Sequence, residues 1–379
     1  MMRVFWNECK KMMSWPIILL IVLVNVAFYV LFIEFYFEYF PNGSEAITFE
    51  LESEWIQEFG PHPIAGKMID DLWIQLEEEK LALTPDLFTL PQVQAMGVDN
   101  IDDIVALSGG SKEYWDMYNA INQSDLADDY QRITQLNYRL HVYEESTEYP
   151  LRSEHPSYTE AQQQRYAELE NRYEYGTYQT RIVDNIQRIS YFSGVSMLTT
   201  LSLLLAPAVL RDTNRNTTSL LYTSKVGRRL AWTKWRTGLL LSFLFITLFI
   251  SFLGYMYVNQ GLQLTWGMDV AHFGYDPKWI DMTVQQYILL SVGLLYAMGM
   301  LYAVLALALS HIQSGVIAQL SIQTILVSLF IWGISSRIVE YPFSLYRNPW
   351  TMPVLIATLV TLAIATFTWT YLREQKKDL

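Results

Sequence analysis

Cysteine is almost absent from this chain. Its 379 residues include one cysteine, Cys9, so no disulfide can form within a single copy of the chain. Extracellular domains with small hydrophobic cores commonly depend on disulfides. A domain that this chain exposes outside the cell must therefore be held together by its own helices and by the membrane.

Motifs for phosphate-binding loops, zinc sites and nucleophilic enzymes are missing as well. The nearest match to a phosphate-binding loop, GGSK at residues 109–112, lacks the first glycine and the spacing of G-x-x-x-x-G-K-S/T. No two histidines lie four residues apart with a carboxylate between them, and no second cysteine can complete a zinc site. A G-x-S-x-G nucleophile motif does not occur. The sequence predicts no metal site, no cofactor and no enzymatic activity on this chain.

Charged residues are scarce and unevenly distributed. They make up 17% of the chain, whereas hydrophobic residues make up 51%. Segment 38–188 contains 29 acidic and 10 basic residues, a net charge of −19, and the remainder contains 9 acidic and 16 basic residues, a net charge of +7. Because the apolar residues are clustered outside the acidic segment, the composition indicates a membrane protein.

Six apolar segments are long enough to cross a hydrocarbon core of about 30 Å as helices. The first, 14–37, contains only Asn25 and Glu34 as strongly polar residues, with Ser14 in position to cap the helix and Pro16 in its first turn. The other five contain no charged residue and lie at 189–210, 237–258, 287–309, 316–336 and 353–371. We therefore expect an all-α polytopic membrane protein with six transmembrane helices.

The short segment before the first span is basic and partly apolar. Residues 1–13 carry Arg3, Lys10 and Lys11 beside apolar and aromatic residues, and no small-residue cleavage site follows the first span. This pattern predicts an interfacial helix that leads into an uncleaved anchor. A frayed basic terminus is the alternative.

Basic residues are concentrated in segment 211–236, which carries seven Lys or Arg and one acidic residue, Asp212. Basic loops are retained on the cytoplasmic side of a membrane. This loop and the tail, 373–379, therefore predict that both termini are cytoplasmic. With six spans in the cell membrane, segment 38–188 would then be an extracellular domain.

Segment 38–188 has no apolar run long enough to span a membrane, and apolar residues recur at helical spacing in 65–83, 111–123, 124–145 and 157–175. Ser111, Ser124 and Ser157 are candidate helix caps. We expect a mostly helical domain inserted between the first two spans. Its acidity would attract a cationic peptide ligand, or it would only keep the surface soluble.

The basic loop carries a pattern of its own, RDTNRNTTSLLYTSKVGRRLAWTKWR. An acidic residue is followed by a Thr-x-x-Leu-Leu segment, a Ser-Lys-x-Gly-Arg turn and Lys234, which leads into the third span. This pattern, with six spans and a long loop between the first two, resembles ABC transporter permease subunits of the type-two exporter class, in particular Gram-positive ones with a large extracellular domain.

The resemblance implies that the loop is a coupling helix docked on a cytoplasmic ABC ATPase subunit dimer, which would bind ATP and Mg. It also implies a second permease chain, identical or related, among membrane lipids, and no nucleic acid. The plainer alternative is a loop that only fixes topology. The residues expected to contact the ATPase are Asp212, Thr217, Leu220, Leu221, Tyr222, Lys225, Gly227, Arg228 and Arg229.

Polar and small residues within the spans have two interpretations each. Asn25, Gln319, Gln323 and Thr324 would line a substrate path or make hydrogen bonds between helices. Two pairs of small residues on the fourth span are spaced for close helix packing. These pairs are Gly293 with Ala297 and Gly299 with Ala303.

Two functions follow from the sequence. The first is a permease subunit that exports or clears a peptide or lipid-like compound, for example in antimicrobial peptide defence, powered by a separate ATPase. The second is a membrane-anchored sensor or adaptor whose acidic domain binds a ligand without transport. Six spans exceed what an anchor needs, which favours the permease.

Overall fold

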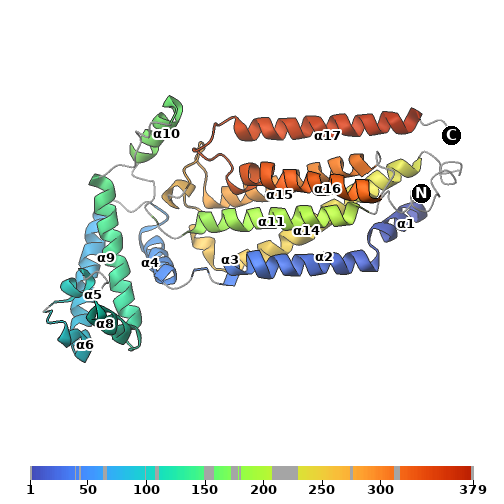
Figure 1. The fold of residues 1–379 in the computed structure, drawn as a ribbon. Coiled ribbons are helices and arrows are strands. Elements are labelled where there is room, and N and C mark those ends of the chain that lie inside the picture. The colour runs from blue at the N-terminus through green and yellow to red at the C-terminus, as the bar shows by residue number, and fades with distance from the viewer. Residues whose placement is uncertain are drawn as a thin grey trace. The chain divides into compact units, whose positions relative to one another are not determined.

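The computed structural model describes most of the chain, and the described part is mainly helical (Figure 1). The β-structure of these residues is limited to isolated bridges: Lys278 pairs antiparallel with Ser344, and Asp269 and Thr283 are single bridge residues. The all-α prediction is confirmed to this extent. The described residues are 2–38, 40–41, 44–62, 66–98, 100–106, 111–148, 158–171, 178, 181–206, 229–273, 276–310 and 316–376.

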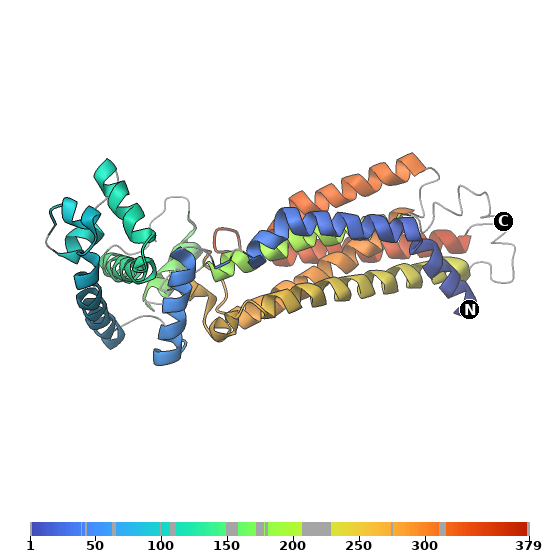
Figure 2. The same ribbon diagram turned by 90° about the horizontal axis from the view of Figure 1, so that it is seen from below.

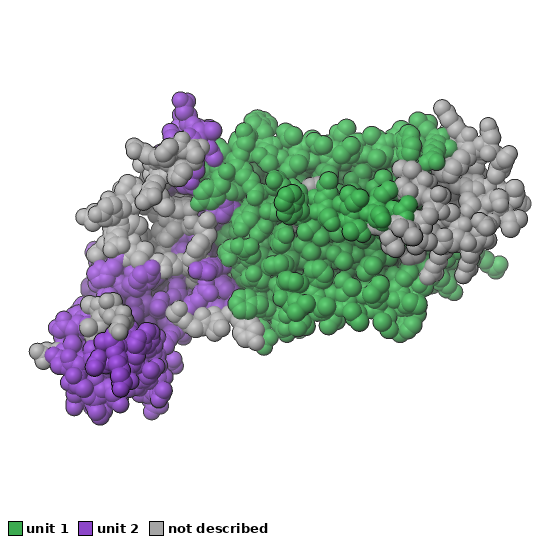
Figure 3. Space-filling view, in the orientation of Figure 1, with its two compact units in different colours: residues 1–39, 183–263, 278–379 green, residues 40–182, 264–277 purple. Residues whose placement is uncertain are grey.

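The chain divides into two compact units, coloured separately in Figure 3. The first, called the span unit here, comprises Met1–Tyr39, Val183–Gln263 and Lys278–Leu379. The second, called the inserted unit, comprises Phe40–Ile182 and Leu264–Pro277. Residues 259–286 connect the third and fourth spans. Their middle part, Leu264–Pro277, belongs to the inserted unit, so this connection is more than a loop between two helices.

Six helices are long and apolar enough to cross a membrane, as the sequence predicts. The first span consists of α2 (Trp15–Phe28), η1 (Tyr29–Ile33) and α3 (Glu34–Glu38). The middle spans are α11 (Ile182–Leu205), α14 (Arg229–Val258) and α15 (Val284–Ser310). The fifth joins α16 (Val316–Leu329) to η4 (Phe330–Glu340), and the sixth is α17 (Thr351–Lys376).

Four spans extend at least four residues beyond their predicted limits, because charged residues enter the helices. Helix α14 begins at Arg229 instead of 237, and α17 ends at Lys376 instead of 371. The second helix begins at Ile182 instead of 189, and the fifth span runs to Glu340 instead of 336. Arg188 Nη1 lies 3.0 Å from Glu340 Oε1 and its Nε lies 3.8 Å from Asp184 Oδ1. These ion pairs keep both charged helix ends within the folded bundle. Hydropathy windows that end at the first charged residue therefore misplace the ends of these spans.

Two span segments, η1 and η4, are π-helical, with wider turns than the α-helix. In η4, Arg337 Nη1 donates to the carbonyl oxygen of Gly333 at 2.5 Å, four residues earlier. Apolar periodicity does not distinguish a π-helical segment from an α-helical one over so few turns. Neither segment is predicted from the sequence.

The span unit is built around α11 and α15. Helix α15 packs against α14, α16, η4 and α17. In the most apolar stretch of each span, 61% of α11 is buried within the protein but only 6% of the first span is. The first span therefore presents an apolar surface to its surroundings, whereas α11 lies inside the bundle.

The residues before the first span form helix α1 (Met2–Met12), not a frayed terminus. This helix packs against α14, as Figure 2 also shows. Met12 is fully buried in the apolar core of the span unit, and Cys9 is buried as well. Lys11 pairs with Glu8 at 2.7 Å, one turn earlier. One face of α1 is thus part of the bundle.

Only one of the two small-residue pairs on α15 lies at a helix contact. A Cβ atom on Gly299 would lie 2.7 Å from Ile246 Cδ1 and 3.1 Å from Met197 Cε, and Ala303 is fully buried. Gly293 and Ala297 are exposed, and a Cβ atom on Gly293 would meet nothing within 4 Å. Close packing of α15 with α14 and α11 therefore depends on Gly299.

Replacement of Gly299 by alanine is expected to destabilise the chain by about 1–3 kcal/mol, because the added methyl group overpacks this contact. The matched change, Gly293→Ala, should leave stability unchanged or raise it by up to about 1 kcal/mol, because alanine favours the helix. Denaturant unfolding in detergent micelles measures both. Equal effects of the two changes would contradict the assignment of Gly299 to the contact.

The inserted unit has α9 (Ala127–Glu148) at its centre. This helix packs against α4 (Ser44–Phe59), α5 (Lys67–Leu87) and α8 (Lys112–Asn122). The expected apolar stripe is buried at Tyr130, Ile133, Leu136 and Leu140, and the side chain of Tyr143 lies outside the described residues. The other elements are α6 (Pro91–Ala95), α7 (Ile101–Ala106), α10 (Glu160–Asn171) and η3 (Val270–Phe273). The short helix η2 (Leu262–Thr265) contains the boundary between the two units.

Helix limits in the inserted unit follow the sequence expectation in part. Ser111 caps α8, because its Oγ accepts from the amide of Tyr114 at 3.1 Å. Ser124 precedes α9 by three residues and bonds within the turn, and Ser157 lies outside the described residues. Helix α4, with Leu51 and Trp55 buried, was not predicted, because acidic residues interrupt its apolar pattern.

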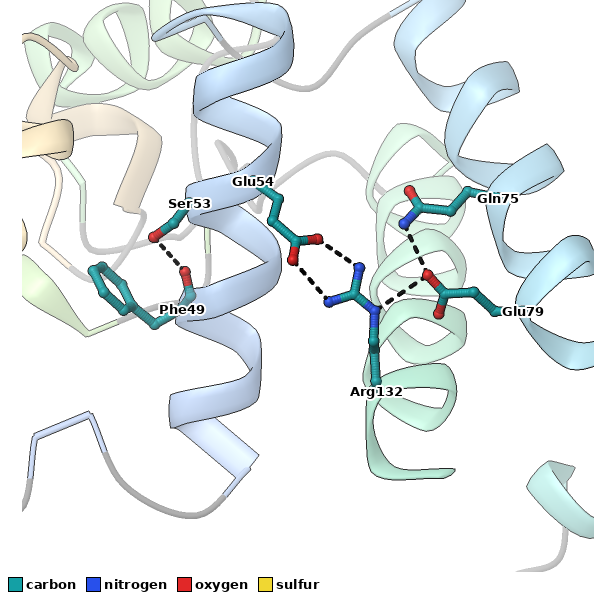
Figure 4. A network of polar contacts seen from close by, with 6 residues as sticks. All are labelled: Phe49, Ser53, Glu54, Gln75, Glu79 and Arg132. Atoms are coloured by element: carbon teal, nitrogen blue, oxygen red, sulfur yellow. Dashed lines mark hydrogen bonds and ion pairs between the residues drawn. The ribbon is translucent and has the colours of Figure 1, made fainter. Parts of the chain in front are cut away.

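Three helices of the inserted unit are joined by polar contacts around Arg132 on α9 (Figure 4). Its guanidinium donates to both carboxylate oxygens of Glu54 on α4, at 2.5 and 3.2 Å, and to Glu79 on α5 at 3.1 Å. Gln75 Nε2 donates to the same oxygen of Glu79 at 2.9 Å. Glu79 is thus a structural partner, not only part of an exposed acidic face.

Candidate functional site

The residues expected to contact an ATPase fall almost entirely outside the described part of the chain. Eight of the nine predicted coupling residues, from Asp212 to Arg228, belong to the segment 207–228 that the described ranges leave out. Arg229 begins α14, and its side chain is not among those described. The candidate site that the structure does show is formed by the polar side chains of α11 and their neighbours.

Asn25 on α2 makes hydrogen bonds to α11. Its Nδ2 donates to Thr200 Oγ1 at 2.7 Å and to the carbonyl oxygen of Ile21 at 2.8 Å. Ser196 Oγ donates to Asn25 Oδ1 at 3.0 Å. Ser196 and Thr200 are almost fully buried. Asn25 therefore uses its donor and acceptor atoms to join the first and second spans.

The three polar residues predicted on the fifth span do not share one environment. Gln323 is buried, and its Oε1 accepts from Ser202 on α11 at 3.2 Å. Its Nε2 has no hydrogen-bond partner among the described residues. Thr324 is exposed, and Gln319 belongs to α16 with a side chain outside the described set. Of these three, the structure brings only Gln323 to α11.

Polar contacts also close the end of the bundle where α11 begins. Arg188 pairs with Glu340 and Asp184, as described above. Asn185 Nδ2 donates to the carbonyl oxygen of Tyr36 at 3.1 Å, and Gln260 Nε2 donates to the same oxygen at 2.9 Å. These contacts join α11, α3, η4 and the residues after α14. Sequence reasoning missed them, since their partners lie up to 224 residues apart.

Hydroxyl residues repeat along α11 at spacings of three or four. Ser190, Ser193, Ser196 and Thr200 are all buried, with at most 5% of each exposed. Residues at this spacing lie on one face of a helix. The second span therefore directs a stripe of hydroxyl groups into the bundle. The spacing is readable from the sequence and would have been the signal for this face.

The chemistry of these side chains limits the functions that the site can have. The side chains of the stripe are neutral hydrogen-bonding groups, and the ion pairs lie at the end of the bundle. Polar groups within a span face other helices or a pathway, because exposure to lipid is unfavourable. The site can therefore hold helices in register and bind neutral hydrogen-bonding ligands.

Comparisons with protein-family models, with curated proteins and with solved structures give no match. The functional assignment therefore rests on the residues and contacts of this chain.

Proposed function

We propose that this chain is the permease subunit of an ATP-driven transporter that exports or clears a peptide or lipid-like compound. A separate pair of cytoplasmic ATPase subunits would bind ATP and Mg and supply the energy. In this proposal both termini are cytoplasmic, the inserted unit is extracellular, and a second permease chain completes the membrane part. The observation that carries the proposal is a six-span bundle whose most buried helix presents hydroxyl groups to the interior.

The third span is suited to transmit movement from the basic loop. Helix α14 begins at Arg229, the last of the nine predicted coupling residues, and its 30 residues extend to Val258. At 1.5 Å per residue this is a continuous helix of about 45 Å. Its first turns contact two other elements: α1 packs against it, and Trp232 lies 5.4 Å from the ring of Tyr371 near the end of α17. A displacement of the loop would thus reach α1 and the end of α17, and the continuous helix would transmit it along the bundle.

The first span supports a two-chain assembly. Its exposed apolar residues include Leu19, Leu23, Val26, Val30 and Leu31. Such a surface is suited to lipid or to another membrane-embedded chain. In contrast, an anchor for a sensor does not need a buried hydroxyl stripe. These features favour the permease over the sensor or adaptor.

The proposal is tested by the partner that co-purifies with the chain. Changing Leu220, Leu221 and Tyr222 together to aspartate should abolish stoichiometric co-purification of an ATPase from native membranes in mild detergent. Loss of the three apolar side chains removes the predicted contact, and the added charge disfavours it. Quantitative mass spectrometry of the purified assembly measures the ratio.

A control variant carries the same added charge without loss of apolar contact: Thr213, Asn214 and Asn216 changed together to aspartate. It should keep most of the ATPase. A chain that purifies without any ATPase, yet forms a complete and functional assembly, would refute the permease proposal and leave the sensor or adaptor.

A further inference from the structure

A cavity of about 100 Å³ lies within the span unit between α11, α14 and α15. Its walls come from the beginning of α11, the last turns of α14 and the beginning of α15, so it lies within about three turns of one end of these helices. Most of the lining is aliphatic. Its polar lining residues are Ser190 and Ser193 on α11, Tyr257 on α14 and Ser291 on α15.

The hydroxyl oxygens of Ser193, Tyr257 and Ser291 are buried and have no hydrogen-bond partner among the described residues. Ser193 is 0% exposed and Ser291 is 3% exposed. Other hydroxyls of the same bundle are satisfied: Ser242 donates to the carbonyl oxygen of Gly238 at 2.8 Å, and Ser196 donates to Asn25. An unsatisfied buried hydroxyl is unfavourable, and more so in a membrane. Three such groups around one cavity indicate a missing partner.

The lining limits what this partner can be. No acidic or basic side chain lines the cavity, so it offers nothing to stabilise a bound charge. Hydroxyl groups can donate to a carbonyl oxygen, and the aliphatic walls fit methylene groups. An engineered apolar cavity of about 150 Å³ holds one benzene molecule. This smaller cavity therefore accommodates a carbonyl group with a few carbon atoms.

The part of such a ligand that does not fit in the cavity can extend out of it beside Gly254. This residue lines the cavity, is exposed, and has no atom within 4 Å of the position that a Cβ atom would occupy. A side chain at this position would enter open space. The glycine thus marks an unobstructed side of the cavity.

We propose that this cavity binds the ester or amide carbonyl and the adjoining methylenes of a neutral amphiphile, with Ser193, Tyr257 and Ser291 as hydrogen-bond donors. This goes beyond the proposed function, because binding needs neither ATP nor a partner subunit. Two sources share this chemistry: a two-chain lipid of the bilayer, and a single-chain amphiphile that enters from the membrane.

The test is photo-crosslinking to the full chain in phosphatidylcholine nanodiscs without nucleotide. One probe is a monoacylglycerol and the other a diacyl phosphatidylcholine, each with a diazirine three carbons from the ester carbonyl. Mass spectrometry should place crosslinks on α11, α14 and α15 around the cavity. Labelling by the phospholipid assigns a bilayer lipid, whereas labelling by the monoacylglycerol alone assigns a single-chain amphiphile.

The triple variant Ser193→Ala, Tyr257→Phe, Ser291→Ala should lower this labelling by at least about tenfold, because each lost hydrogen bond weakens binding several-fold. Gly254→Leu should lower it too, by filling the open side. The control Ser242→Ala removes a satisfied hydroxyl of the same bundle and should keep full labelling. Size-exclusion profiles show whether each variant is folded.

Absence of crosslinks at the three helices with both probes would overturn the proposal. Labelling that is unchanged in both the triple variant and Gly254→Leu would overturn it as well. If the triple variant melts at a higher temperature and no probe labels the wild type, the hydroxyls are merely unsatisfied or hydrated. The aspartate variant of Leu220, Leu221 and Tyr222 should label normally, so a failure here is distinguishable from a failure of the proposed function.

Discussion

Replacement of Arg139 by methionine is expected to destabilise the inserted unit by about 3–5 kcal/mol. Arg139 on α9 forms an ion pair with Glu52 on α4, and their side chains are only 4% and 2% exposed. The guanidinium also lies 5.9 Å from the centre of the Trp55 ring. Without Arg139, the carboxylate of Glu52 stays in a low-dielectric environment and loses its ion pair with the guanidinium. Pulse proteolysis of the full chain across a denaturant series measures the change.

Two controls separate this effect from a general loss of charge. Arg181→Met removes a charge whose side chain is 63% exposed and whose Nε lies 4.0 Å from Glu45 Oε1, and it should change stability by less than about 1 kcal/mol. The double variant Glu52→Leu, Arg139→Met should recover most of the stability, because it removes both buried charges. An effect of Arg139→Met no larger than that of Arg181→Met would contradict the structural role assigned to the pair.

Acidification should destabilise the inserted unit through His272 on η3. Burial, together with the smaller effect of the nearby His62, lowers the pKa of His272 to about 4. The imidazole is 5% exposed and packs near Tyr178, whose amide donates to the carbonyl oxygen of His272 at 2.8 Å. In the unfolded chain the pKa of histidine is about 6.5. Between these values the unfolded state binds more protons, so the free energy of unfolding falls as the pH is lowered.

The loss should amount to roughly 3 kcal/mol by the time the pH reaches the folded pKa. His272→Phe removes this contribution, so its unfolding free energy should depend less on pH between about 6.5 and 4 than that of the wild type. His141, which is exposed on α9, provides the control: His141→Gln should keep the wild-type pH dependence. Parallel pH profiles for wild type and His272→Phe would exclude a buried neutral imidazole.

Much of the fold could be predicted because a bilayer imposes long apolar runs that are legible in one sequence. The six spans and the stripe at Tyr130, Ile133, Leu136 and Leu140 follow from hydropathy and helical spacing. Helix ends were less predictable where charges are paired across the fold. In the sequence, the charge of Arg188 indicates the end of a span. In the structure, Arg188 lies within the helix and pairs with Glu340, 152 residues later.

Residues of the candidate site could be predicted only where a single polar residue lies within an otherwise apolar segment. Asn25 is conspicuous in an apolar span, so its polar role was expected, whereas its partners Ser196 and Thr200 became apparent only with the packing of α2 on α11. The cavity hydroxyls could not be identified, because a serine within a span is common and its significance depends on the rotation of three helices. The ATPase contact stays a prediction from the loop sequence.

The buried position of α11 has a consequence for biogenesis. Its hydroxyl groups, together with Asp184, Asn185, Gln187 and Arg188, make it the least apolar of the six candidate spans, whereas the first span is the most apolar. Transfer of a nascent helix from the translocon into lipid depends on its apolar content. The first span can therefore partition by itself, but α11 needs neighbouring helices to shield its polar face. The polar partners of α11 that follow it in the chain include Gln323 on α16 and Glu340 on η4, so its polar face is shielded completely only after the fifth span has been synthesised.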